Sequence, residues 1–93
     1  MPPEARLHAI IQGRVQGVSF RFYTLNRARE LGVTGYVINR WDDTVEVVAE
    51  GQRAALEELL SYLRTGPRGA FVTGVAIEWL PAVGDFRRFE VRH

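Results

Sequence analysis

Two helical patterns separate runs of β-type residues in this 93-residue chain, and their order restricts the folds open to it. The stronger pattern, over residues 52–66, contains a stripe of leucines at three- and four-residue spacing: Leu56, Leu59, Leu60 and Leu63. Such a stripe is typical of an amphipathic helix that packs on a core. A weaker pattern predicts a second helix over residues 20–31, with Ser19 as its N-cap and Gly32 just beyond its end.

The other apolar runs have the two-residue period or the β-branched content of strands. They cover residues 7–13, 34–41, 44–51, 71–80 and 86–92. Asp42 and Asp43 lie between the second and third runs and predict a hairpin turn. The element order is strand, helix, strand, strand, helix, strand, followed by one short strand. It predicts an α+β sandwich with two helices on one face of a mostly antiparallel sheet.

This topology brings two distant segments together. In a split βαβ unit the first two strands run parallel, and the third strand lies between them, antiparallel to both. The C-terminal ends of the first two strands therefore share one edge of the sheet, about 10 Å apart at roughly 4.8 Å per strand. We expect the loop that follows Gly13 to lie near the side chain of Asn39.

The loop between the first strand and the first helix has the composition of an anion site. Its residues are Gly13, Arg14, Val15, Gln16, Gly17, Val18 and Ser19. Glycine tolerates the positive φ values that turn successive N–H groups inward, and a helix N-terminus adds partial positive charge. Arg21 follows in the first helical turn, where its guanidinium can donate two parallel hydrogen bonds to a phosphate. On spacing alone, an ordinary strand–helix turn with a surface arginine is favoured, because short glycine patterns often arise by chance.

Composition excludes several classes of function. The formal net charge of +1 argues against a basic face for a long polyanion. The absence of cysteine excludes disulfides, thiolate catalysis and cysteine-ligated metals. The start, MPPEARLHAI, lacks the apolar centre of a secretion signal, and no apolar run reaches the roughly 18 residues of a membrane span. We expect residues 1–93 to form a single domain, located in the cytoplasm as a monomer.

Four segments resemble the acylphosphatase family, in the expected order and over nearly the whole chain. They are GRVQGVSFRFYT (13–24), GYVINR (35–40), VEVVAEG (45–51) and GPRGAFV (66–72). The GxVQGVxFR element is specific enough to identify the family by itself. The resemblance implies a ferredoxin-like sandwich, which agrees with the predicted topology. It also implies hydrolysis of acyl phosphates to a carboxylate and inorganic phosphate, with no metal and no cofactor.

The same resemblance assigns roles to individual residues. Arg21 would bind the substrate phosphate together with the backbone amides of residues 13–19. Asn39 would orient the attacking water, and Thr24 would brace the loop through Gln16. The implied partner is a small acyl phosphate, with inorganic phosphate or sulfate as a competing anion and with no nucleic acid or membrane. The family commonly has Asp-Gly where this chain has Asp42-Asp43, which puts the turn geometry in doubt.

Structural roles are favoured for the other polar residues of note. Ser19 is expected to cap the helix, because no histidine or lysine base lies near it in sequence. His8 and His93 lack the spacing of a metal site, and Glu46 and Glu50 are expected to be solvent-facing charges on one strand face. Four aromatic residues are expected to pack in the core or at its rim: Trp41, Phe71, Trp79 and Phe86.

Two alternative functions remain open at this stage. RNA-recognition modules share the element order, but the strand over residues 44–51 has two glutamates and no aromatic residue for base stacking. The second alternative keeps the anion site without free enzyme activity. It would be a regulatory or carbamoyl-phosphate-handling module like those fused within larger hydrogenase-maturation proteins.

Overall fold

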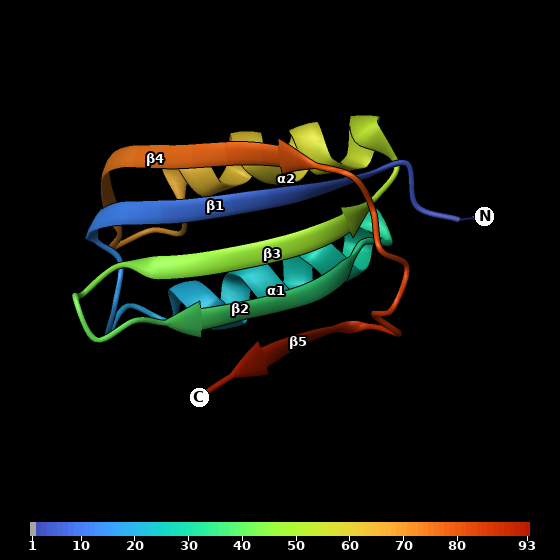
Figure 1. Cartoon of the computed structure of the whole chain (residues 1–93). Helices are drawn as coiled ribbons and strands as arrows, with labels where there is room; N and C mark the ends of the chain where they lie inside the picture. Colours follow the sequence, from blue (N-terminus) through green and yellow to red (C-terminus); the bar gives the residue numbers. More distant parts are fainter. Residues whose placement is uncertain (1) are drawn as a thin grey trace.

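Residues 2–93 are described by a computed structural model, and they form two helices and five strands. The elements are β1 (Ala5–Arg14), α1 (Phe20–Leu31), β2 (Thr34–Asn39), β3 (Val45–Gly51), α2 (Arg53–Thr65), β4 (Phe71–Leu80) and β5 (Phe89–Arg92). The strands form one sheet in the order β4-β1-β3-β2-β5, and both helices cover the same face of it (Figure 1). Neighbouring strands are antiparallel except for β2 and β5. The predicted α+β architecture is therefore confirmed.

The register confirms the juxtaposition that the topology predicts. β3 lies between β1 and β2, and its residue Val45 is paired with Ile11 on one side and with Asn39 on the other. Since β1 and β2 both run antiparallel to β3, they run parallel to each other. The end of β1 and the end of β2 thus lie two strand spacings apart, about 10 Å, at one edge of the sheet.

The core lies between the sheet and the helices, as the two periodicities predict. Its fully buried residues include Leu7, Ala9 and Ile11 of β1, Val37 of β2, Val45 and Val47 of β3, and Leu56, Leu59 and Leu63 of α2. α1 buries fewer apolar side chains than α2, and Leu25 and Leu31 are only partly covered. Neither helix of the described chain is long and apolar enough to cross a bilayer.

The last strand is shorter than predicted, and a buried carboxylate holds the connection that leads to it. β5 covers residues 89–92 and pairs in parallel with β2. Glu50, expected to face solvent, is only 1% exposed. Its carboxylate accepts hydrogen bonds from Arg6 Nε at 2.8 Å, Val83 N at 2.7 Å and Gly84 N at 2.9 Å. The expectation was wrong because the β4–β5 connection folds back over this part of the sheet and covers the side chain.

These three donors compensate for the loss of hydration. Burial by itself favours the neutral acid, but the hydrogen bonds from Val83, Arg6 and Gly84 outweigh it and lower the pKa of Glu50 below its ordinary value. A buried acceptor with this many donors is costly to alter, because each N–H would lose its partner. Glu50 therefore links β3 to the segment that sets the position of β5.

We expect Glu50→Gln to lower the free energy of unfolding by about 3 kcal/mol, because the new NH₂ group must face an N–H donor. Urea unfolding at pH 7 measures this loss. Glu46→Gln is the matched control, since Glu46 is on the same strand and its side chain is 24% exposed beside His8. We expect that control to cost at most about 1 kcal/mol.

The same comparison has a defined pH dependence. Because folding lowers the pKa of Glu50, its stabilising contribution is complete above the ordinary value of 4.5 and is lost as the pH falls through the folded pKa. The difference in unfolding free energy between the wild type and Glu50→Gln should therefore shrink in acid. A difference that stays constant down to pH 3 would contradict a charged, hydrogen-bonded Glu50.

Candidate active site

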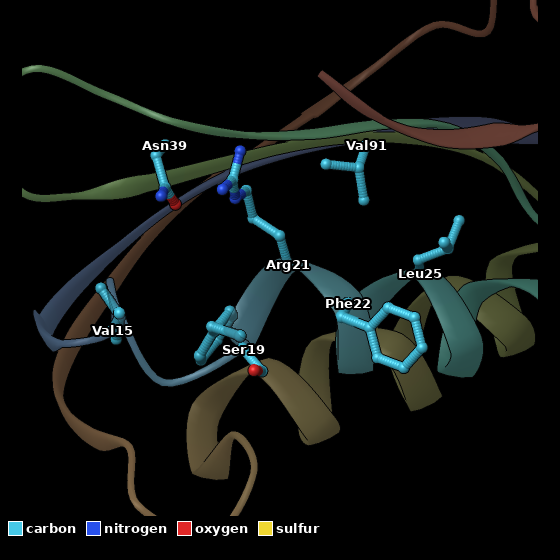
Figure 2. A pocket seen from close by; sticks show the side chains of 9 residues that line it. Val15, Ser19, Arg21, Phe22, Leu25, Asn39 and Val91 are labelled. Atoms are coloured by element: carbon cyan, nitrogen blue, oxygen red, sulfur yellow. The ribbon is translucent and has the colours of Figure 1, made fainter. Parts of the chain in front are cut away.

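A pocket of about 570 Å³ opens between the start of α1 and the β2–β5 side of the sheet. Its lining comes from the loop, the first turns of α1 and the two strands: Val15, Gly17, Ser19, Phe20, Arg21, Phe22, Leu25, Asn39 and Val91. Figure 2 shows the guanidinium of Arg21 beside the amide of Asn39. The two side chains that the sequence analysis singled out therefore meet in one pocket.

The loop over residues 13–19 owes its shape to left-handed backbone conformations. φ is 122° at Gly13, 75° at Gly17 and 61° at Ser19. A Cβ atom at Gly13 would collide with the backbone oxygen of Phe71, so only glycine fits there. At Gly17 a Cβ would meet no atom within 4 Å, so the positive φ alone favours glycine. These turns let the chain pass from β1 to α1 around the pocket.

The N–H groups of this loop are available to a ligand. Within residues 2–93, the backbone N–H groups of residues 16–19 donate to no other atom of the chain. They lie just before the N-terminus of α1, which adds the partial positive charge of the helix dipole. A loop of this kind suits the oxygen atoms of an anion.

Arg21 carries a positive charge that no carboxylate of the described chain neutralises by an ion pair. Its Nη1 donates to the backbone oxygen of Arg92 at 3.2 Å and lies 3.2 Å from Nδ1 of His93. Its Nε and Nη2 have no acceptor within residues 2–93. The end of β5 thus orients the guanidinium across the pocket and leaves further donors for a ligand.

Asn39 is the last residue of β2 and lines the pocket. Its Oδ1 is buried and accepts no hydrogen bond from any of residues 2–93. Buried side-chain oxygens are nearly always hydrogen-bonded in folded proteins, so an acceptor without a protein partner is suited to a water or a ligand.

Gln16 makes the contact that joins the loop to the β2–β3 hairpin. Its Nε2 donates to the backbone oxygens of Arg40 at 2.7 Å and Thr44 at 2.9 Å. The expected bracing of the loop by Thr24 through Gln16 is not formed, since the buried Thr24 Oγ1 has no hydrogen-bond partner in the described chain. The Gln16 amide reaches the nearby hairpin carbonyls instead, which holds the loop in a fixed relation to Asn39.

The hairpin turn keeps its left-handed position although aspartate replaces the usual glycine. Asp43 has a φ of 72°. Asp42 accepts hydrogen bonds from the hydroxyl of Thr44 at 2.6 Å and from its N–H at 3.2 Å, and the first of these is the main cause of its lowered pKa. Aspartate tolerates this conformation better than most residues, at a modest energetic cost. The departure from Asp-Gly therefore leaves the position of Asn39 intact.

Several expectations about other residues need correction. Ser19 occupies the N-cap position of α1, but it makes no side-chain cap hydrogen bond. Its left-handed conformation differs from the extended one that capping requires, and its hydroxyl points away from Arg21 and Asn39 (Figure 2). Two of the aromatic residues expected in the core or at its rim are instead largely exposed, Trp41 at 93% and Phe71 at 69%.

Within residues 2–93 no three acidic or histidine side chains come together as a metal site.

Comparison with known proteins shows the family and the fold. The acylphosphatase family model matches residues 7–91. An acylphosphatase from Pelotomaculum thermopropionicum is 45% identical over 94% of this chain and 95% of its own length. The crystal structure of an acylphosphatase from Bacillus subtilis superposes with a TM-score of 0.92 at 30% identity, covering 96% of this chain and 99% of that one. An acylphosphatase from Coxiella burnetii gives a TM-score of 0.90 at 39% identity, covering 97% and 94%. The chain therefore belongs to the acylphosphatase family and hydrolyses acyl phosphates.

Proposed function

We propose that residues 13–19 and Arg21 hold the phosphoryl group of the acyl phosphate while Asn39 positions the attacking water. The observation that carries this proposal is the meeting of Arg21, Asn39 and the loop in one pocket. The loop supplies N–H groups without protein acceptors, and Arg21 supplies a charge without an ion-pair partner in the described chain. Both features suit a doubly charged phosphoryl group.

Such a site can catalyse the reaction mainly by positioning and by stabilising charge. An acyl phosphate is an anhydride whose carboxylate leaves readily, so the departing oxygen needs no strong acid. The loop amides and Arg21 would hold the equatorial phosphoryl oxygens as charge shifts between them in the transition state. The attacking and leaving oxygens lie roughly in line during the transfer. The bond from water oxygen to phosphorus forms as the bond from phosphorus to the carboxylate oxygen breaks.

Asn39 would fix the water on the attacking side. Its Oδ1 can accept a hydrogen bond from the water, but an amide cannot remove a proton at neutral pH. We infer that the water proton passes to an oxygen of the substrate phosphoryl group, so that the products are a carboxylate and inorganic phosphate. No enzyme group has to change its ionisation for this step.

The direct test is release of phosphate from acetyl phosphate and benzoyl phosphate by the purified chain in excess EDTA. We expect turnover to be the same with and without the chelator, because the proposed site uses only amides and a guanidinium. Inorganic phosphate or sulfate should inhibit competitively. Loss of turnover in EDTA, restored by a divalent cation, would overturn the metal-independent mechanism.

We also propose that residues 1–93 act as a single-domain monomer in the cytoplasm and bind no nucleic acid. The formal net charge of +1 offers little attraction to a polyanion. Sedimentation equilibrium tests the oligomeric state, and a dimer at micromolar concentration would contradict it.

A further inference from the structure

The end of β5 holds the guanidinium of Arg21, so the position of this strand bears on the proposed reaction. The backbone oxygen of Arg92 accepts the hydrogen bond from Arg21 Nη1 at 3.2 Å. β5 is an edge strand of four residues that pairs with β2 alone, in parallel (Figure 1). The end of such a strand opens at little free-energy cost unless other contacts hold it. The side-chain contacts of Arg92 therefore decide how firmly its carbonyl is held.

The side chain of Arg92 lies on the face of the sheet opposite the helices. Phe89 and Val91 of β5 face the core, and successive side chains of a strand alternate between the two faces. Val37 of β2 also lies in the core, so Tyr36 is on the same outer face as Arg92. There the Arg92 guanidinium lies over the Tyr36 ring, with Cζ 4.1 Å from the ring centroid. This is the geometry of a cation–π contact.

The Tyr36 ring also contacts the start of the segment that leads into β5. Its centroid lies 6.0 Å from that of the Phe86 ring, in an edge-on arrangement. Arg6 lies over the Phe86 ring at 5.0 Å and donates to the buried Glu50 carboxylate at 2.8 Å. One ring thus contacts both Phe86 and Arg92, which lie at the two ends of the segment. The first of these ends is tied to the buried carboxylate.

A second contact of the Arg92 side chain is weak. Its Nη2 lies 3.4 Å from Oε1 of Glu90, and the two side chains are 46% and 41% exposed. Ion pairs this open to solvent contribute little, because water screens them and ordering two long side chains costs entropy. The Tyr36 ring is therefore the stronger of these two anchors for the end of β5.

We propose that Tyr36 is a positioning residue for acyl phosphate hydrolysis. Its ring holds the Arg92 side chain, the Arg92 carbonyl accepts the hydrogen bond from Arg21, and the guanidinium stays aimed into the pocket. Neither Tyr36 nor Arg92 lines the pocket, so their effect on the reaction passes through Arg21. A guanidinium that is already ordered binds the phosphoryl group without a further entropy cost. This inference rests on the proposed function, in which Arg21 binds that group.

The first test is the steady-state kinetics of two Tyr36 variants. Tyr36→Leu should raise KM for acetyl phosphate, and the inhibition constant of inorganic phosphate, by about tenfold, since Arg21 would have to be ordered on binding. Its kcat should fall by less than about threefold, because Asn39 and the loop amides are unchanged. Tyr36→Phe keeps the ring and should stay within about twofold of the wild type on both measures. An unchanged KM in Tyr36→Leu would overturn the inference.

Arg92→Gln tests the same contact from the other side. The side chain is exposed, so the variant should fold normally, and it loses the cation while keeping the carbonyl. We expect a rise in KM similar to that in Tyr36→Leu, with no further rise when the two changes are combined. Rises that multiply in the double variant would show two independent effects and contradict the proposal.

A double-mutant cycle with Arg21 separates positioning from general damage to the fold. In the Arg21→Ala background no guanidinium remains to be positioned, so adding Tyr36→Leu should change kcat/KM by less than about twofold. The same fall in both backgrounds would show that Tyr36 acts by another route and would overturn the inference alone. Near-normal turnover in Arg21→Ala by itself would instead overturn the proposed function.

Trp79→Leu is the matched control, because Trp79 is another strand aromatic that carries an arginine. Arg53 lies over its ring at 3.6 Å, and β4 is at the edge of the sheet opposite β5. The control should lose stability in urea unfolding, since Trp79 packs against the core. Its KM should nevertheless equal that of the wild type. A rise in KM as large as in Tyr36→Leu would assign the effect to lost stability and contradict the proposal.

Discussion

Replacing Arg21 with alanine should lower kcat/KM for an acyl phosphate by about 1,000-fold or more, the effect expected when a charged group is removed from a phosphoryl-transfer site. The guanidinium is the one charged side chain among the residues that line the pocket. Without it, the loop amides alone would face the phosphoryl charge. The variant should fold normally, because Arg21 is partly exposed and its two contacts involve only residues at the end of β5.

The same variant should also lose the response of the protein to phosphate. Phosphate at a hundred times its dissociation constant should stabilise the wild type by about 2.7 kcal/mol, and thermal unfolding would report this as a raised Tm. Arg21→Ala should show little of this shift, and Arg21→Lys should recover only part of it because an ammonium group lacks the planar fork. Arg64→Ala, which removes an exposed arginine from α2, is the control for net charge. Normal turnover in Arg21→Ala would contradict the role of Arg21 in binding the phosphoryl group.

Replacing Asn39 with alanine should lower kcat by about 100-fold or more while phosphate binding is largely kept, because the side chain acts on the water and not on the phosphoryl group. Steady-state kinetics and the phosphate-induced Tm shift, measured on the same preparation, separate these two effects. Removing the buried Oδ1 also removes an acceptor that has no protein partner in the described chain, so stability should change little.

Asn26→Ala is the matched control, since Asn26 is an exposed asparagine on α1 outside the pocket. Its turnover should equal that of the wild type. A near-normal kcat in Asn39→Ala would contradict the role of Asn39 in positioning the attacking water. A pH–rate profile of the wild type that requires an ionised enzyme group near neutrality would argue instead for a general base and against proton transfer to the substrate.

Much of the fold could be predicted because it depends on local patterns. The leucine stripe of α2 and the alternation in β1 show which side chains face the core, so the element types followed from them. The element order then predicted that β3 lies between β1 and β2, whereas the pairing of β5 with β2 was not predicted. Asn39 could be placed near the loop for the same reason, since the strand order decides which ends share an edge. The GxVQGVxFR element then identified the family, which element order alone could not do.

Other features depend on how segments far apart in sequence meet, and local patterns carry no signal for them. The burial of Glu50 depends on a connection more than thirty residues further along the chain, which supplies two N–H donors only after it folds back. Gln16 was expected to take part in bracing the loop, but its partners could not be predicted, because they are main-chain oxygens, which every sequence supplies at every position.

The sequence by itself determined which residues could bind a phosphoryl group: a loop with two glycines that favour turning, one arginine after it and one asparagine at a strand end. The tertiary structure alone decided how they are held and what lies beside them. It brought the carbonyl of Arg92 to Arg21 and placed Val91 across from Leu25. The physical reason is that residue chemistry is local, whereas orientation and neighbouring surface come from packing between elements that only the complete fold brings into contact.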